Sequence, residues 1–197
     1  GSISCSTCHR PEAAFAGTEP VSAGIDGRKG RRNAPSLLNR AYAQSLFWDG
    51  RAATLEAQAL LPIENPTEMG ATMRDVLAKL RQVPAYSRAF ATAFSDGISG
   101  PNLAKALASY QRTQLTGNSL VDQFRNGTVT VLSDSARQGL WLFESRGLCW
   151  TCHSGRNFTD ESFHNTGVGT GKAPVDLGSY SSRVTFISHG RQRIRLI

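Results

Sequence analysis

The stretch Cys5-Ser6-Thr7-Cys8-His9 decides how we interpret this chain. Two cysteines separated by two residues and followed directly by histidine form the attachment sequence of a c-type haem. The thiols add to the vinyl groups of the porphyrin as thioethers, and the histidine ligates the iron. A single copy could also arise by chance or hold zinc.

The same pattern recurs at Cys149-Trp150-Thr151-Cys152-His153. The two motifs use all four cysteines of the chain and two of its four histidines. Chance would rarely place every cysteine in this way, so we predict two covalently bound haem c groups. The predicted attachment residues are Cys5, Cys8, Cys149 and Cys152, and the predicted ligands of the haem iron are His9 and His153.

Length, composition and cysteine use limit the class of protein. The 197 residues suit one large domain or two small ones, 40% of them are hydrophobic, and no apolar run approaches the roughly 20 residues of a membrane span. Haem attachment occurs outside the reducing cytosol, so we expect the bacterial periplasm. No signal peptide is visible before the first motif, so we expect a processed or cut N-terminus.

The net charge of +7 raises the question of an acidic partner or nucleic acid. The four propionates of two haems would offset up to four of these charges. Basic residues gather at 28–32 and 183–195 without interleaved aromatic residues, which a single-strand binder would need. We therefore expect no nucleic acid as a partner.

Hydrophobic periodicity and capping residues predict helices and no strands. Residues 10–39 are expected to form a long ordered loop, and residues 117–131 a linker with little regular structure. The fold class is all-α, with two c-type cytochrome-like haem domains at 1–117 and 118–197 and long ordered loops. The expected helices are 54–61, ended or bent by Pro62; 72–82, capped by Thr72; 84–94; 102–116, capped by Asn102; and 133–145, capped by Ser133.

Between the two motifs, Glu68 and Gln58 suggest catalysis. An iron with an open coordination position binds peroxide, and cleavage of the O–O bond requires a group that moves a proton between the two oxygens. Glu68 could be that group and Gln58 a neutral donor, with Pro62 and Pro66 interrupting the helix between them. The alternative is a solvated loop carboxylate and a surface helix residue. Trp48 could relay electrons between the haems or simply belong to the core.

Together these residues resemble the bacterial di-haem cytochrome c peroxidases and their MauG-like relatives. The match covers most of residues 4–178 in the family's order. The stretches that carry it are Ser4-Cys5-Ser6-Thr7-Cys8-His9, Gly24-Ile25-Asp26-Gly27, Arg32-Asn33-Ala34-Pro35-Ser36-Leu37, Phe47-Trp48-Asp49-Gly50-Arg51, Pro62-Ile63-Glu64-Asn65-Pro66 with Glu68-Met69, and Cys149-Trp150-Thr151-Cys152-His153 with Asn157-Phe158-Thr159-Asp160 and Phe163-His164-Asn165.

The resemblance implies a role for each of these residues. The first haem would reduce hydrogen peroxide, with His9 below it, Gln58 and Glu68 on the opposite side, and Pro62 near it. Trp48 would lie between the haems, and the second haem, on His153, would take electrons from a small cytochrome c or copper protein. Asn33 resembles a ligand of an inter-haem calcium ion.

Two departures from the family pattern stand out. No histidine lies between His9 and His153, whereas the switching peroxidases carry one in the loop now occupied by Ile25 and its neighbours. The first haem is therefore expected to be open without prior reduction. After Gly178 the pattern is lost, including the sixth ligand of the second haem, so we expect a fragment or a truncated form, which would be inactive if that region is required. His164 is expected to hydrogen-bond near the haem edge.

Three alternatives remain beside the peroxidase. A MauG-like oxidase would act on the tryptophans of a partner protein, a di-haem electron carrier would not react with peroxide, and a zinc module would be colourless. The sequence leaves the oligomeric state open, with a homodimer as one choice.

Overall fold

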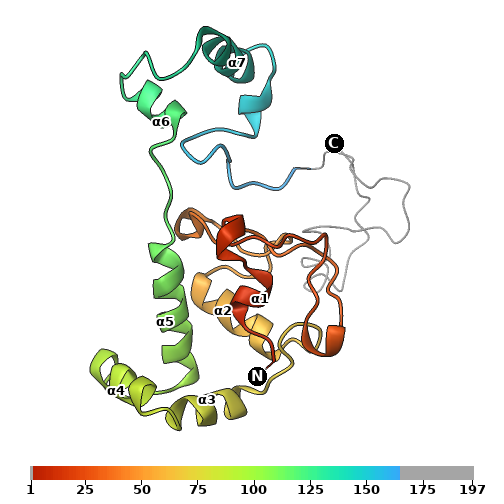
Figure 1. The fold of residues 1–197 in the computed structure, drawn as a ribbon, viewed down its shortest axis with the longest axis vertical. Helices are drawn as coiled ribbons and strands as arrows, with labels where there is room; N and C mark the ends of the chain where they lie inside the picture. The colour runs from red at the N-terminus through yellow and green to blue at the C-terminus, as the bar shows by residue number, and fades with distance from the viewer. Residues whose placement is uncertain (1, 165–197) are drawn as a thin grey trace, which may run out of the picture. The chain divides into compact units, whose positions relative to one another are not determined.

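The structure is a computed structural model and describes residues 2–164 (Figure 1). Its described part divides into two compact units, residues 2–115 and 116–164. The domain assignment made from the sequence, 1–117 and 118–197, stays a prediction because its second part extends beyond the described residues.

Residues 2–164 are helical, with irregular segments between the helices. The β pairing in this range consists of isolated bridges, which join Arg10 to Ala16, Ala23 to Lys29 and Leu46 to Ala52. The all-α prediction is confirmed. The helices are α1 Cys5–Cys8, α2 Leu55–Glu64, α3 Met73–Arg81, α4 Pro84–Ala93, α5 Gly100–Thr113, α6 Leu120–Arg125 and α7 Asp134–Glu144; 3₁₀ turns lie at Pro11–Ala13, Ile25–Gly27, Arg40–Tyr42 and Cys149–Thr151.

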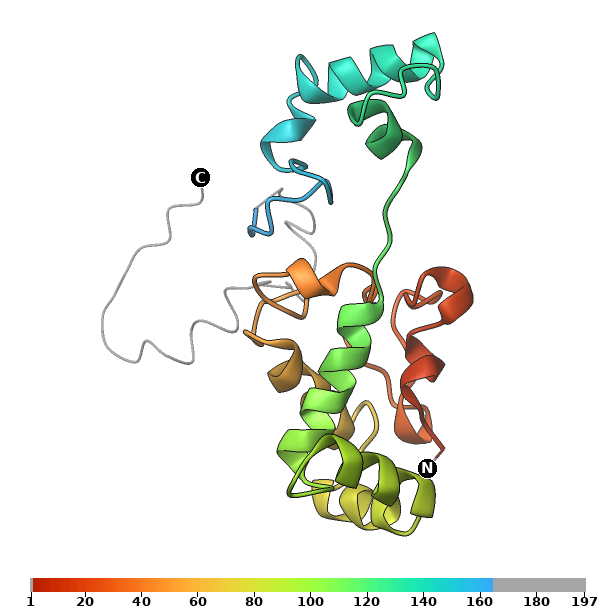
Figure 2. The same cartoon turned by 90° about the vertical axis from the view of Figure 1, so that its left-hand side faces the viewer.

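The core of the first unit lies where α2 packs along α5 (Figure 2). Ala108 of α5 has no exposed surface and packs with Leu55 of α2 and with Leu46 and Ala52 of the preceding loop. A small residue at position 108 lets the two helices approach closely. The contact holds α2, and with it the segment that follows its C-terminus, in a fixed place. A second cluster completes this core with Ile63, Phe90, Ile98 and Leu103.

Helix starts agree with the predicted caps at two places and differ at a third. The hydroxyls of Thr72 and Ser133 accept hydrogen bonds from the backbone of their helices, as predicted. The predicted cap Asn102 is wrong, because Ser99 caps α5 and the helix begins at Gly100. Pro101 suits the first turn, since a missing N–H costs nothing there. Asn102 is buried and donates to Asp96 and Gly97 instead.

Two other boundaries differ from prediction. Helix α2 continues past Pro62 to Glu64 and ends before Pro66, because a proline disfavours helical backbone in the residue before it. The predicted linker 117–131 contains α6, which begins with a capping box in which Ser119 and Asp122 bond to each other's backbone N–H. By contrast, the predicted ordered loop is confirmed, because residues 10–39 hold only short turns.

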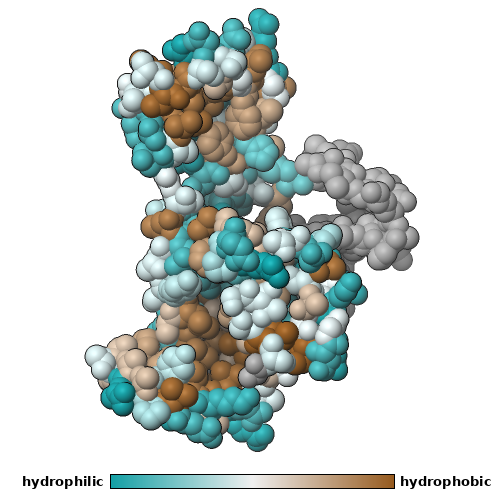
Figure 3. Space-filling model, in the orientation of Figure 1, coloured by the Kyte–Doolittle hydropathy of each residue, from teal (hydrophilic) through white to brown (hydrophobic). Residues whose placement is uncertain are grey.

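The second unit has an apolar surface and little interior. Leu132 is the only buried hydrophobic residue among positions 116–164, and Figure 3 shows apolar surface over α6 and α7, where Leu120, Trp141 and Leu142 are exposed. A large apolar group bound at the second motif would supply the missing interior. In the described part of the chain no helix combines the length and the apolarity required to cross a membrane.

Candidate functional site

The imidazole of His9 is oriented by backbone carbonyls. Its Nδ1 lies 3.0 Å from the carbonyl oxygen of Phe15 and 3.0 Å from that of Pro35. A carbonyl can only accept, so Nδ1 carries the proton and donates it. Nε2 is therefore the unprotonated nitrogen and is the atom available to ligate a metal.

The second motif repeats this arrangement with one carbonyl. Nδ1 of His153 lies 3.1 Å from the carbonyl oxygen of Phe158, so Nε2 is again the free nitrogen. The Phe158 ring packs edge-on against Phe143 and Trp150, with centroid distances of 5.7 and 6.4 Å. The aromatic cluster thus fixes the residue that orients His153.

The donor set of the two motifs fits haem better than zinc. Cys5, Cys8, Cys149 and Cys152 are free thiols. No group of three or more His, Cys, Asp or Glu side chains among residues 2–164 is arranged to hold a metal ion. A haem needs one imidazole from each motif and two thiols for attachment, and each motif supplies these.

A cavity of about 520 Å³ contains the predicted acid–base residue. Glu68 lines it together with Pro62 and Asn65 at the end of α2 and with Phe47 and Arg51 from the preceding loop; the other lining residues are Leu61 and Glu64. His9 is close enough to the Glu68 carboxyl that a proton on both ring nitrogens would lower the pKa of Glu68. The structure therefore brings Glu68 and the first motif to one place.

The carboxyl group of Glu68 is held by one oxygen. Nδ2 of Asn65 donates to Oε1 at 3.0 Å, and Oε2 has no partner among the described residues. Burial raises the pKa of the Glu68 carboxyl above its ordinary value, although Arg51, His9 and the Asn65 hydrogen bond act in the opposite direction. A carboxyl with a raised pKa and a free oxygen suits proton transfer near neutral pH.

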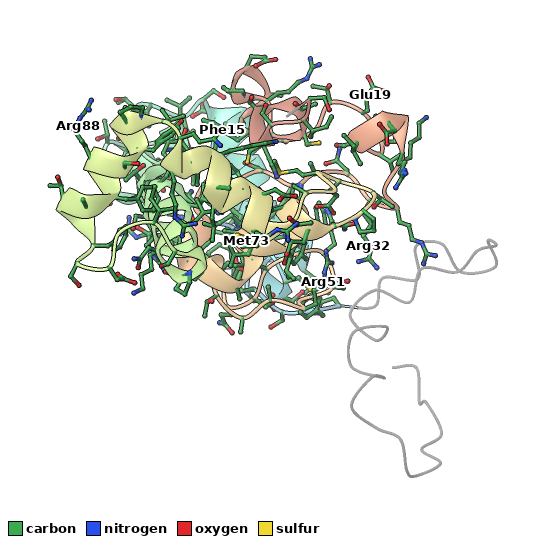
Figure 4. The ribbon with its side chains drawn as sticks, turned by 90° about the horizontal axis from the view of Figure 1, so that it is seen from below. Phe15, Glu19, Arg32, Arg51, Met73 and Arg88 are labelled. Carbon is green, nitrogen blue, oxygen red and sulfur yellow. The ribbon has the colours of Figure 1, made fainter. Side chains whose placement is uncertain are left out.

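Arg51 is fixed beside this cavity by a buried carboxylate. Nη1 of Arg51 donates to both oxygens of Asp49 at 2.9 Å, and Nη1 of Arg32 donates to Oδ2 at 3.0 Å. The Arg51 guanidinium also lies 3.4 Å above the centroid of the Phe47 ring. Figure 4 shows Arg32 and Arg51 on the same side of the first unit. A positive charge is thereby held near the Glu68 carboxylate.

The Asp49 carboxylate should stabilise the fold only while it is ionised. Burial tends to raise the pKa of Asp49, but Arg51 and Arg32 together hold it below its ordinary value. Its contribution is therefore complete above the unfolded-state pKa of about 3.9 and is lost as the pH falls through the lower folded-state value. We expect Asp49→Asn to lower the free energy of unfolding at pH 7 by about 2 kcal/mol.

Urea unfolding of the haem-loaded protein followed by circular dichroism measures this effect. Glu12→Gln is the control, because Glu12 makes only an exposed ion pair with Arg10 at 3.8 Å and should change stability by less than about 0.5 kcal/mol. The difference between wild type and Asp49→Asn should shrink below about pH 4. A difference that persists unchanged at pH 2 would contradict the ionic origin.

Gln58 and Pro62 lie one turn apart on the same face of α2. Pro62 lines the cavity, whereas Gln58 is half-buried and is not among the lining residues. The side chain of Gln58 makes no hydrogen bond within residues 2–164. The structure thus groups Pro62 with Glu68 and places Gln58 beside them, and the role of Gln58 stays a prediction.

Trp48 and Asn33 lie next to each other. The indole Nε1 of Trp48 donates to the carbonyl of Asn33 at 2.8 Å, and the residue is 56% exposed, so Trp48 is not part of a core. Nδ2 of Asn33 donates to the carbonyls of Gly17 and Glu19 at 3.0 and 2.7 Å. This leaves Oδ1 of Asn33 as the acceptor that a cation could use.

A second cavity of about 390 Å³ adjoins the second motif. Its lining includes Cys149, Cys152 and His153 together with Asp160 and His164. Nε2 of His164 lies 2.8 Å from Oδ2 of Asp160. His164 therefore lies near the second motif and is held by a carboxylate, and its expected hydrogen bond near the haem edge stays a prediction.

Sequence reasoning did not single out Asn65, Asp49 or Arg51 as site residues. Asn65-Pro66 is a dipeptide that marks turns, and Oδ1 of Asn65 accepts from the backbone N–H of Thr67 at 3.0 Å. The available signal for Asn65 was this turn, because it begins three residues before Glu68 and so brings the amide of Asn65 near the Glu68 carboxyl. No local signal indicated that Asp49 would be buried between two arginines.

Comparison with known proteins identifies similar chains. Residues 1–130 match the sequence model of a family described as di-haem cytochrome c peroxidase. The methylamine utilization protein MauG of Methylorubrum extorquens is 38% identical over 180 residues, which are 90% of this chain and 50% of that protein. The cytochrome c551 peroxidase of Pseudomonas aeruginosa is 35% identical over 169 residues, 84% of this chain and 49% of that protein.

Solved structures agree with these matches. A MauG-like protein associated with microbial copper homeostasis superposes with a TM-score of 0.83 at 30% identity, covering 91% of this chain and 59% of that one. The diheme peroxidase BthA of Burkholderia thailandensis gives a TM-score of 0.74 at 26% identity, covering 93% of this chain and 56% of that one. The chain spans about half the length of the curated relatives it matches.

Proposed function

The chain belongs to the di-haem cytochrome c peroxidase family, and from that premise we propose that it reduces hydrogen peroxide to water with electrons from a small redox protein. The observation that carries the proposal is the cavity in which Glu68, with its raised pKa and a free Oε2, lies within electrostatic reach of His9. A solvated loop carboxylate would not be held in this way.

Three residues of this chain would have separate roles in peroxide reduction at the first site. Nε2 of His9 would hold the iron of the first haem, which would bind peroxide and supply electrons for its reduction. Oε2 of Glu68 takes the proton from one peroxide oxygen and returns it to the other, so that the second oxygen leaves as water. Arg51, fixed by Asp49, stabilises negative charge that develops in the cavity.

The second motif is proposed as the entry point for electrons. Cys149 and Cys152 would attach its haem by thioether bonds, as Cys5 and Cys8 would attach the first, and His153 would hold its iron. The electron donor would be a small cytochrome c or copper protein, with Trp48 as the relay toward the first haem. Asn33 is proposed to bind calcium through Oδ1, and the periplasm is the proposed compartment.

Peroxide turnover by the haem-loaded protein tests this function directly. We expect each molecule of peroxide to oxidise two equivalents of a reduced one-electron donor such as a small cytochrome c, and peroxide alone to change the absorption spectrum of the haem-loaded protein. The expected spectral change comes without prior reduction, because no histidine from the Gly24–Arg28 segment can cap the first iron. An unchanged spectrum together with no donor oxidation would instead indicate a plain electron carrier.

Oxidation of a partner protein is a second candidate function. The similarity to two proteins named MauG, at 38% and 34% identity, favours it. The same cavity and the same Glu68 would then act, but the electrons would come from tryptophan side chains of the partner. Peroxide consumption that depends on a tryptophan-bearing partner and not on a reduced cytochrome would select this candidate.

A further inference from the structure

The turn at Gly24–Arg28 lies directly against the loop that carries Glu68. The backbone N–H of Ile25 donates to the carbonyl oxygen of Glu68 itself at 2.7 Å. Two residues earlier in the same loop, the carbonyl of Pro66 accepts from Nη1 of Arg28 at 3.2 Å. The turn is closed by its own bond from the N–H of Gly24 to the carbonyl of Arg28 at 2.7 Å. It can therefore act as a rigid partner for the loop.

The closest approach is at Gly24. A Cβ atom at this position would lie 2.2 Å from the carbonyl oxygen of Thr67 and 2.5 Å from that of Glu68. The φ angle of Gly24 is −95°, which any residue adopts. Glycine is thus required here because the Glu68 backbone fills the space of a side chain, and not because of an unusual backbone angle.

The opposite side of the same loop is held by α2. The N–H of Met69 donates to the carbonyl of Pro62 at 3.1 Å, and the N–H of Glu68 donates to the carbonyl of Asn65 at 3.0 Å. Glu68 therefore has its amide bound toward the helix and its carbonyl bound toward the turn. A shift of the turn would rotate this peptide segment and move the carboxyl group with it.

We propose that the Gly24–Arg28 turn is a positioning element that holds Glu68 in its working orientation in the cavity. The inference rests on the proposed function, in which Glu68 moves the proton. The turn itself touches neither substrate nor haem in this role. Its contribution is preorganisation, and a displacement of about 1 Å at a reacting group can cost about 100-fold in rate.

The test compares Gly24→Ala with Gly30→Ala in the haem-loaded protein. A Cβ at Gly30 meets nothing within 4 Å, so this variant is the matched control and should stay within about twofold of wild type. Gly24→Ala should lower kcat by about 100-fold while both haems remain attached. Hydrogen exchange should show a faster Ile25 amide in Gly24→Ala only, because its acceptor is the Glu68 carbonyl.

Two readouts separate positioning from simple loss of structure. The pH profile of kcat should shift in Gly24→Ala, because the distances from Glu68 to the charged groups that line the same cavity, Arg51 and Glu64, change. The double variant Gly24→Ala with Glu68→Gln should be no slower than Glu68→Gln alone, since the turn acts only through Glu68. A further loss in the double variant would overturn the inference.

Arg28→Met tests the positioning role of the turn if Gly24→Ala does not fold. It removes the bond to Pro66 without a steric clash, and we expect kcat to fall about fivefold with the same direction of pH shift. Unchanged kinetics in Arg28→Met, or full activity in Gly24→Ala despite rapid Ile25 exchange, would overturn the positioning role and leave the proposed function intact. Full activity in Glu68→Gln would instead remove the proposed function.

Discussion

Glu68→Gln is expected to lower peroxide turnover by about 10² to 10⁴-fold, the range typical for the loss of an acid–base group. Glutamine has the same shape, and its Oε1 can still accept the hydrogen bond from Nδ2 of Asn65. The amide cannot take up and release a proton at neutral pH, so only proton transfer is lost. Steady-state oxidation of a reduced cytochrome c by peroxide measures the effect, and the absorption spectra of both haems should be unchanged.

Glu64→Gln is the matched control for this variant. Glu64 lines the same cavity, and its Oε1 accepts from the backbone N–H of Met73 at 3.2 Å, which an amide oxygen can also do. We expect turnover within about twofold of wild type, since Glu64 transfers no proton in the proposed reaction. Equal losses in the two variants would show that cavity charge, and not the Glu68 proton, limits the rate.

Replacement of Cys149 and Cys152 by serine is expected to abolish turnover driven by a donor protein. Without thioether bonds the second haem should be lost, and the pyridine haemochrome assay should report one haem per chain in place of two. The first motif is in the other compact unit, so its haem should still respond to peroxide in the absorption spectrum. Electrons from the donor would then have no entry point.

Thr151→Ser controls for disturbance of the second motif. The Thr151 hydroxyl donates to the carbonyl of Leu148 at 2.6 Å, and serine keeps that bond, so both haems and full turnover should remain. Donor-driven turnover that survives in the double serine variant would show that electrons enter without the second haem. That result would contradict the electron path and leave the role of Glu68 untouched.

The sequence predicted those features that depend on local chemistry. The spacing of cysteine and histidine residues predicted both motifs, and the orientation of His9 and His153 fits that prediction. Helical periodicity and the caps Thr72 and Ser133 predicted α3 and α7 closely, because these signals lie within a few residues of the helix ends.

Features that depend on long-range contacts were not predictable in this way. The burial of Asp49 requires Arg32 and Arg51 to meet around it, and the need for glycine at position 24 follows from a loop more than 40 residues away. The passage of α2 through Pro62 likewise depends on packing, since α2 is held along α5. A single sequence contains no local sign of these contacts.

The backbone carbonyls beside His9 and His153 accept from Nδ1 of each ring and leave Nε2 free. The oxygens of Phe15, Pro35 and Phe158 belong to peptide groups, which are uncharged and do not titrate. A carboxylate in the same place would pull the proton away and give the ring partial imidazolate character. Each ring would thus offer Nε2 of a neutral imidazole to the proposed haem iron, held by partners that carry no charge.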